Sequence, residues 1–422
     1  MTGPEDATPT RPAIEDRLAA AGLPPLPRLA WLELDLGALV GNLAVLRDLA
    51  DPGTPLFPVV KADAYGHGAG PIARALEAAG AEGFCVAAMD EALALRAGGI
   101  TRPIRVLYPV PASFAATAAE SGIGLAVGDP GLLDVLLVAA RATADRGGPP
   151  LDLEVEVETG LGRGGVLPAD LPATIARIVA SPGVRLGGLW THLQASEDPV
   201  TTAAQLATFD AAIAALRAAG HPVPTRHLAA SGGLLTEVAS LEGARPGLLV
   251  YGLVPDELET TAPVALDPAV ISRFRPVLSL HARPVRVADL PAGHGIGYGP
   301  TFTTTRPSRI ATLPIGYADG FSRGLSNRAE ALVRGHRVPL VGNVAMDAVM
   351  ADVTDVPGPP VTTNDECTLI GAQGEARITV GDLARLRTTN RWEVVSQMAR
   401  RLPRVYDAPS ASVGVRTLTV EI

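Results

Sequence analysis

The sequence is short of cysteine and has no long uninterrupted apolar run. Only two cysteines, Cys85 and Cys367, occur among 422 residues, and no metal-ligand spacing surrounds either. We interpret both as buried thiols in a reducing compartment, with neither a disulfide framework nor a metal site. No apolar stretch is long enough to span a bilayer, and the polar first residues lack the pattern of a signal peptide. A soluble cytoplasmic protein with no membrane partner is therefore expected.

Aromatic residues are also scarce, at 4% of the chain, so aliphatic side chains must fill the core that a 47% hydrophobic content predicts. The formal net charge is −9. This acidic balance argues against a nucleic-acid partner, because phosphates are bound by clustered Lys and Arg. A chain of this length is expected to form two domains.

Two sequence textures divide the chain. Residues 1–28 offer little apolar surface and are expected to form a flexible extension. From residue 29 to 264, apolar runs alternate with Ala-rich stretches of helical periodicity, which predicts parallel strands with crossover helices. The eight runs that predict strands of a (β/α)8 TIM-type barrel are FPVVK, GFCVAA, IRVLYP, GIGLAV, LEVEVE, LGGLWTH, RHLAA and ARPGLLVYG. Over residues 265–422, runs such as VLSLHARPVRV and ECTLIGA predict a mostly antiparallel β domain, with one helix at ITVGDLARLRTT.

Polar side chains collect where the predicted barrel strands end, which is where parallel barrels place their reactive groups. Lys61, Arg163, His192 and Ser231 all follow or end such strands. A desolvated lysine near other cations has a lowered pKa and can form a Schiff base with a carbonyl, as pyridoxal phosphate requires. Taken alone, Lys61 would be read as a lysine that leaves a strand for solvent.

The motif PVVKADAYGHG closely resembles the cofactor-lysine motif of alanine racemases, the fold-type III pyridoxal-phosphate enzymes. Other segments resemble the family in the same order, and together they span almost the whole chain: WLELDLGALVGNLAVLR, DEALALR, VETGLGRGG, WTHLQASED, RPGLLVYG, IGYGPTFT, LPIGYADGFSR, VGNVAMDAVMADVT and RLPRVY. The resemblance implies a barrel followed by a β domain, bound pyridoxal 5'-phosphate, and a homodimer with shared active sites.

The resemblance also implies a role for each matching position. Lys61 would be the Schiff-base lysine and one catalytic base, and Tyr298 the base on the opposite face of the cofactor. Racemisation needs this pair, because a proton is removed from one face and supplied on the other. Tyr317 and Met346 would lie at the substrate entrance and carboxylate site, with Tyr298 and Met346 supplied by the partner subunit.

The remaining roles implied by the resemblance concern the cofactor. Arg245 would lie beside the pyridine nitrogen, and Arg163 would hold the phenolic oxygen and help to place the substrate carboxylate. His192 would orient the tyrosine base and Arg245. The phosphate contacts would be Tyr65, Ser231 and the backbone of Gly247 and Leu248. Because Arg245 must face the barrel mouth, we expect ARPG to end the eighth strand and LLVYG to begin a short helix, whose N-terminal amides suit a phosphate.

Three positions depart from the common family pattern. Many alanine racemases have a lysine, often carbamylated, where this chain has Glu156, which can supply an anion to Arg163 directly. Ala230 replaces a common asparagine. Arg400 stands where an aromatic residue often completes the phosphate cup, and we assign it to cofactor binding.

Four functions remain open at this point. The first is an alanine racemase that supplies D-alanine, which in this family serves cell-wall precursors. The second is a racemase of the same fold for another amino acid, such as serine. The third is a fold-type III decarboxylase, and the fourth is a non-enzymatic cofactor carrier, although such carriers are usually a lone barrel.

Overall fold

The computed structural model describes residues 12–260, 266–408 and 411–421. The chain divides into two compact units, which we call the barrel unit (Ala38–Val277 and Asn390–Ser396) and the sheet unit (Met1–Gly37, Leu278–Thr389 and Gln397–Ile422). The expected domain boundary at residues 264 and 265 lies outside the described residues. Within the described ranges, no helix has the length and apolar character needed to cross a membrane.

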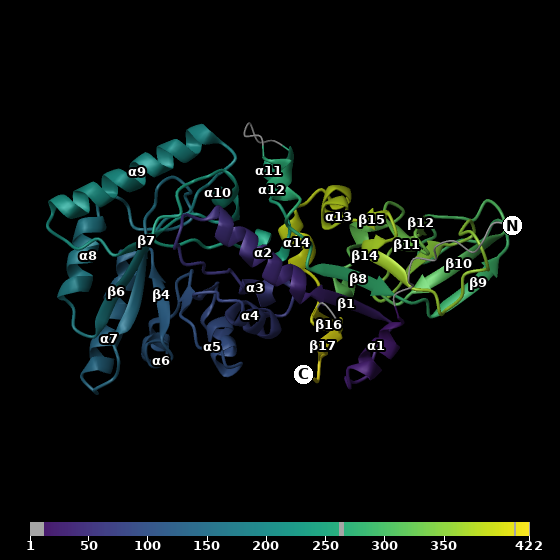
Figure 1. Ribbon diagram of the computed structural model, residues 1–422, viewed down its shortest axis with the longest axis horizontal. Helices are drawn as coiled ribbons and strands as arrows, with labels where there is room; N and C mark the ends of the chain where they lie inside the picture. Colours follow the sequence, from purple (N-terminus) through teal and green to yellow (C-terminus); the bar gives the residue numbers. More distant parts are fainter. Residues whose placement is uncertain (1–11, 261–265, 409–410, 422) are drawn as a thin grey trace. The chain divides into compact units, whose positions relative to one another are not determined.

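The barrel unit contains a parallel sheet of six strands among the described residues, in the order β2-β3-β4-β5-β6-β7. Its strands are β2 (Phe84–Val86), β3 (Ile104–Val106), β4 (Ile123–Val127), β5 (Leu151–Glu156), β6 (Val184–Trp190) and β7 (Thr225–His227). They alternate with crossover helices α5 (Met89–Ala97), α6 (Ala115–Glu120), α7 (Pro130–Ala144), α8 (Leu171–Ala180) and α9 (Pro199–Ala218). Figure 1 shows α7, α8 and α9 outside the strands.

The first and eighth predicted strands close this sheet into a barrel through single bridges instead of full ladders. Leu56 pairs in parallel with Ala244, and Val59 pairs in parallel with Cys85. The Val59 amide donates to the Pro246 carbonyl at 2.8 Å, and the Arg245 amide donates to the Ala229 carbonyl at 2.8 Å. The ladders are short because Pro55, Pro58 and Pro246 lie in these segments, and proline has no backbone N–H to donate. The predicted TIM-type barrel is confirmed, with this proline-rich seam as its closing edge.

The other helices of the barrel unit connect or cover its ends. They are α2 (Leu36–Leu49, which begins in the sheet unit), α3 (Lys61–Tyr65), α4 (Ala69–Ala78), η1 (Ala112–Phe114), α10 (Ser231–Leu235), η2 (Leu248–Tyr251), α11 (Asp256–Thr260), α12 (Pro268–Ile271) and α14 (Arg391–Ser396). The short helix η2 begins directly after Ala244–Gly247. This agrees with the expectation that ARPG ends the eighth strand and LLVYG begins a short helix.

The sheet unit is a mostly antiparallel sheet, as predicted. Its order is β17-β16-β1-β8-β14-β11-β12-β13-β10-β9 over the described residues, with β15 paired to β14. The strands are β1 (Ala30–Asp35), β8 (Leu278–Ala282), β9 (Arg286–Leu290), β10 (Ser308–Leu313), β11 (Glu330–Val333), β12 (His336–Val341), β13 (Val349–Asp352), β14 (Cys367–Gln373), β15 (Ala376–Ile378), β16 (Arg404–Ala408) and β17 (Ala411–Arg416). Short 3₁₀ turns η3 (Tyr317–Asp319) and η4 (Arg323–Leu325) lie between strands, and the expected helix at ITVGDLARLRTT is α13 (Val380–Arg387).

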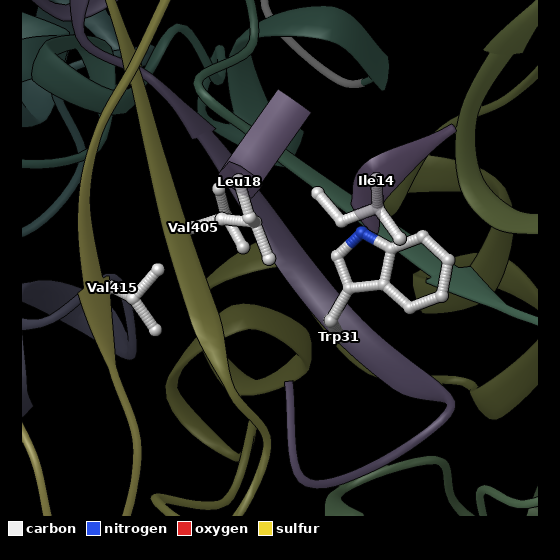
Figure 2. Packing of buried hydrophobic residues seen from close by; sticks show 5 residues of the cluster. All are labelled: Ile14, Leu18, Trp31, Val405 and Val415. Atoms are coloured by element: carbon white, nitrogen blue, oxygen red, sulfur yellow. The ribbon is translucent and has the colours of Figure 1, made fainter. Parts of the chain in front are cut away.

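The N-terminal segment differs from the expected flexible extension over residues 1–28. Residues 1–11 lie outside the described residues, but Ile14–Ala20 form helix α1. Ile14 and Leu18 are buried against Trp31, Val405 and Val415, as Figure 2 shows. Ile14 and Leu18 are four residues apart, so both side chains lie on one face of a short helix. Two apolar residues in so polar a segment are too few for sequence periodicity to indicate a packed helix.

Strand β1 also lies outside the barrel that we expected to begin at residue 29. It pairs in parallel with β16 and antiparallel with β8. Arg17 of α1 donates to Glu33 at 3.0 Å and to Asp407 at 2.6 Å, and so links the helix to both paired strands. The pairing joins residues that are more than 350 positions apart in sequence, so local patterning gives no sign of it.

Helix α14 belongs to the barrel unit although it comes late in the chain. The α3–α4 loop approaches it so closely that a Cβ on Gly66 would overlap the Val395 carbonyl oxygen. Gly66 also has a φ of +79°, in the left-handed region. Gly53 has a similar φ of +81°, but open space surrounds the position of its Cβ. Substituting Gly53 therefore tests the stability cost of an L-residue at positive φ alone. Substituting Gly66 adds the cost of the close contact with α14.

We predict that Gly53→Ala lowers the free energy of unfolding by about 1 kcal/mol, because L-residues are disfavoured at positive φ. Gly66→Ala should add a further ~1–3 kcal/mol, since α14 must move to admit the methyl group. Equilibrium urea unfolding of both variants measures the difference. Equal losses in the two variants would show that the contact between Gly66 and Val395 carries no stability.

Candidate active site

A cavity of about 350 Å³ opens in the barrel unit. Eight of the residues assigned from sequence line it: Lys61, Tyr65, Arg163, His192, Ser231, Arg245, Gly247 and Leu248. They come from loops after the C-terminal ends of the strands and from the closing seam. The structure therefore brings together the lysine, the two arginines, the histidine and the hydroxyl groups that sequence reasoning placed on one rim.

Lys61 opens an unusual backbone turn. Four consecutive residues, Ala62 to Tyr65, have positive φ values of 51°, 56°, 55° and 49°. A left-handed conformation costs roughly 1–2 kcal/mol per L-residue, so the rest of the fold must hold it in place. Glu91 accepts the Ala62 amide at 2.6 Å, and Asp63 accepts the Ala69 amide at 2.9 Å. These bonds fix the lysine at the mouth of the barrel.

Lys61 is the only lysine in the sequence, and the other permanently cationic side chains are all arginines. Burial, and then the charge of Arg163, lower the pKa of its ammonium from the ordinary 10.5. Its Nζ lies 5.8 Å from the centre of the Tyr108 ring. A lowered pKa increases the fraction of free amine, which is the form that attacks a carbonyl.

Arg163 faces both Glu156 and Tyr108. Its Nη2 lies 3.5 Å from Glu156 Oε1, and its guanidinium carbon lies 5.4 Å from the centre of the Tyr108 ring. Burial raises the pKa of Glu156 above the ordinary 4.5, against the lowering effect of Arg163. A single contact of this length is weaker than a bidentate arginine–carboxylate pair. Glu156 is thus the anionic neighbour of Arg163, without the fork geometry that would lock both side chains.

Arg245 is almost completely buried and is held on three sides. It donates to the His227 carbonyl at 2.9 Å, to the Thr191 carbonyl at 2.8 Å, and to the ring Nδ1 of His227. Its guanidinium carbon lies 4.8 Å from the centre of the Trp190 ring. Burial lowers the pKa of Arg245 to about 10, so the side chain stays cationic at neutral pH.

His192 lines the cavity, but the ring that contacts Arg245 belongs to His227. The hydrogen bonds recorded for Arg245 among the described residues go to His227 and Thr191, with none to His192. Burial, followed by the charge of Arg245, lowers the pKa of His192 to about 3, so its ring is neutral at physiological pH. Sequence reasoning passed over His227, the histidine ring that Arg245 contacts, and the role implied for His192 stays a prediction.

Small and hydroxyl-bearing residues form the other end of the cavity. Ser231 Oγ accepts the Gly247 amide at 2.9 Å and the Leu249 amide at 3.2 Å. A Cβ on Gly247 would lie 2.9 Å from Tyr65 Oη, so only glycine leaves room there. Burial raises the pKa of Tyr65, whose phenol therefore stays protonated and can donate a hydrogen bond.

The remaining assigned residues lie in the sheet unit and are not among those that line the cavity. Tyr298, Tyr317 and Met346 are 80%, 44% and 53% exposed. The Tyr317 amide donates to Ala345, and the Ala318 amide donates to Met346, so these two loops are joined. Arg400 is exposed, and the residue near the C-terminus that does line the cavity is Trp392 of α14.

Sequence reasoning missed five residues that shape this site: Tyr108, Glu154, Trp190, His227 and Trp392. A signal for one of them, Glu154, was present in LEVEVE, where the acids alternate with aliphatic residues on a strand buried in the barrel. Acids at that spacing point to one face, which makes Glu154 and Glu156 neighbours inside the barrel. No group of three or more potential metal-ligating His, Cys, Asp or Glu side chains is found among the described residues.

The cavity fits pyridoxal 5'-phosphate in its donor groups. Lys61 offers an amine of lowered pKa for the aldehyde, and Arg245 offers a fixed cation. The Ser231 hydroxyl and the protonated Tyr65 phenol can each donate a hydrogen bond to a phosphate. The chemistry of these side chains therefore agrees with the cofactor that the sequence resemblance implies.

Comparisons with known proteins show the family of this chain. Residues 34–255 match the family model of the alanine racemase N-terminal domain, and residues 277–406 match that of the C-terminal domain. The alanine racemase of Desulfovibrio desulfuricans is 38% identical over 382 residues, which cover 90% of this chain and 98% of that protein.

Solved structures show the same fold. The alanine racemase from Bacillus anthracis with bound L-Ala-P has a TM-score of 0.84 and 31% identity, covering 94% of this chain and 99% of that one. A histidine racemase from Leuconostoc mesenteroides subsp. sake has a TM-score of 0.79 and 30% identity, covering 91% and 99%. Since the two family models together match most of the sequence and the relatives align over nearly their full length, the chain belongs to the alanine racemase family.

Proposed function

We propose that this protein interconverts L- and D-alanine with pyridoxal 5'-phosphate as its cofactor. The observation that carries the proposal is the convergence of Lys61, Arg163 and Arg245 on one cavity. The alanine racemases among the relatives favour alanine as the substrate, and they do not favour a decarboxylase. The histidine racemase of the same fold shows why the fold by itself leaves the substrate side chain open.

The bound cofactor supplies an electron sink that makes the substrate Cα–H acidic. Lys61 then takes or returns the proton at Cα on one face, for which an amine of lowered pKa is suited. Arg163 holds the substrate carboxylate at the cavity mouth. Arg245 would meet the pyridine nitrogen as a fixed cation that does not readily give up a proton, which would keep the sink mild and limit side reactions.

The second base is Tyr298, which we assign to the opposite face from the partner subunit of a homodimer. Support comes from the exposure of Tyr298, Tyr317 and Met346 on the sheet unit. Contiguous exposed apolar side chains mark an interaction surface, and hydrogen bonds join the loops that carry Tyr317 and Met346. The two buried free thiols, Cys85 and Cys367, support the proposal that the enzyme works in the cytoplasm.

The single lysine makes the cofactor assignment easy to test. Borohydride reduction of the purified enzyme should fix pyridoxal phosphate on Lys61, and intact-mass analysis should find one cofactor per chain. Lys61→Ala should lose the adduct and at least about 10²- to 10⁴-fold of alanine racemisation, because it removes a proton-transfer group as well as the attachment point. A panel of L- and D-amino acids, followed by chiral chromatography, should show alanine as the preferred substrate.

Lys61→Arg is the matched control, since it keeps the positive charge but cannot form the covalent link. Retention of the reduced cofactor or of racemisation in either variant contradicts the assignment of Lys61. Faster racemisation of another amino acid than of alanine contradicts the substrate and leaves the cofactor chemistry intact.

Glu156 is the second residue to test, because the sequence resemblance aligns it with a lysine, often carbamylated, of many alanine racemases. No lysine other than Lys61 is present to be carbamylated, so activity should not depend on dissolved carbon dioxide. Glu156→Gln should raise the KM for alanine by loosening Arg163, with a loss on the order of tenfold in kcat/KM. Asp152→Asn, on the same strand but paired with exposed Arg185, is the matched control.

The pH profile of KM gives the sign of the Glu156 effect. Burial raises the pKa of Glu156 above the ordinary 4.5. As the pH falls toward that raised pKa, the wild-type enzyme should lose the carboxylate, and the KM for alanine should rise. Glu156→Gln should remove that branch of the profile. Identical profiles for the two enzymes would mean that the charge of Glu156 does not act on Arg163.

A further inference from the structure

A row of charged and polar side chains crosses the interior of the barrel beneath the cavity. Arg105 of β3 donates from Nε to Glu154 Oε1 of β5 at 3.0 Å, and Glu154 Oε2 lies 3.0 Å from His227 Nε2 of β7. The opposite ring nitrogen of His227, Nδ1, accepts from Arg245. Glu154, His227 and Arg245 are 5%, 0% and 2% exposed, so the contact between the carboxylate and the ring is buried.

Strand β6 lies between Glu154 and His227, and glycine makes room for their contact. A Cβ on Gly188 would overlap Glu154 Oε2, and a Cβ on Gly187 would lie 3.0 Å from Glu154 Oε1. Neither glycine has a positive φ, so backbone conformation does not require glycine at these positions. The space that the Glu154 carboxylate occupies does. The barrel therefore leaves a passage through which the carboxylate reaches a histidine two strands away.

The charges in this row determine which ring nitrogen of His227 carries the proton. Burial would raise the pKa of Glu154, but the hydrogen bond with His227 and the charge of Arg105 outweigh it and hold the pKa below 4.5. Burial, and then Arg245, lower the pKa of His227 to about 4, so the ring is neutral. An ionised carboxylate only accepts hydrogen bonds, so the single ring proton sits on Nε2.

This tautomer presents a lone pair at Nδ1 to Arg245. In the opposite tautomer the His227 Nδ1–H would point at an N–H of Arg245. Both groups are donors, so no hydrogen bond could form between them. We propose that Glu154 is a positioning residue, which fixes the tautomer of His227 and thereby the direction in which Arg245 meets the cofactor. The inference rests on the proposed function, which assigns Arg245 to the pyridine nitrogen.

The simpler alternative is that Glu154 only neutralises Arg105. The Nη1 atom of Arg105 is buried without a hydrogen-bond partner among the described residues, and its guanidinium carbon lies 3.8 Å from the centre of the Phe57 ring. Removing Glu154 alone would leave this cation unpaired, which destabilises a folded protein for reasons unrelated to His227. A variant that removes both charges separates the two roles.

The test compares the wild type, Glu154→Gln and the double variant Arg105→Met with Glu154→Gln. Asp152→Asn is the control, since it removes another carboxylate of β5 whose partner, Arg185 of β6, is exposed. The full-length protein is labelled with ¹⁵N-histidine, and the His227 resonances among the seven histidines are assigned by their loss in His227→Phe. Ring-nitrogen shifts report the tautomer, and titration with pyridoxal 5'-phosphate reports the Kd.

The wild type and Asp152→Asn should show His227 protonated only at Nε2 across neutral pH. Glu154→Gln and the double variant should show a mixture of tautomers and a Kd for pyridoxal 5'-phosphate raised by about tenfold or more, as for other groups that orient a ligand-binding histidine. A wild-type tautomer and Kd in the double variant would overturn the proposal, because Arg105 is no longer there to be neutralised. If the wild type does not bind the cofactor, the proposed function fails, while the tautomer shifts still decide the role of Glu154.

Discussion

The buried guanidinium of Arg245 is the charge on which the rest of the barrel mouth depends. Two carbonyl groups, a histidine nitrogen and the face of Trp190 hold it where water does not reach. Its charge helps to lower the pKa values of His192 and His227, so both rings stay neutral, and it opposes the upward shift at Glu156. The site thus combines neutral histidines with fixed cations, which is an environment suited to a bound anion such as a phosphate ester.

Local strain and close packing place the reactive amine beside that charge. Four left-handed residues follow Lys61, and the hydrogen bonds that the Glu91 and Asp63 carboxylates accept from backbone amides compensate for their cost. Gly66 then admits the backbone of α14, a segment from near the C-terminus that belongs to the barrel unit. A region of positive φ that persists next to a functional lysine is the kind of strain that a fold retains at an active site.

Local sequence pattern was enough for the alternation of strands and helices, the β-rich second half and the rim residues. It was not enough where distant segments meet. The pairing of β1 with β16, the packing of α1 on Trp31 and the return of α14 to the barrel all join residues far apart in the chain. Prolines reduced the first and eighth strands to single bridges. Glu154 and His227 were missed because their contact passes over glycines of an intervening strand, and sequence spacing does not reveal such a contact.

The account assigns one base to the barrel unit of one chain and the other to the sheet unit of its partner. Mixing Lys61→Ala chains with Tyr298→Phe chains tests this division directly, once mass spectrometry has shown that subunits exchange. Each mixed dimer would hold one site with both bases and one site with neither, so an equal mixture should recover about a quarter of wild-type alanine racemisation from two nearly inactive parents. Complete exchange without any recovery of activity would contradict the account, because each chain would then have to supply both bases to its own site.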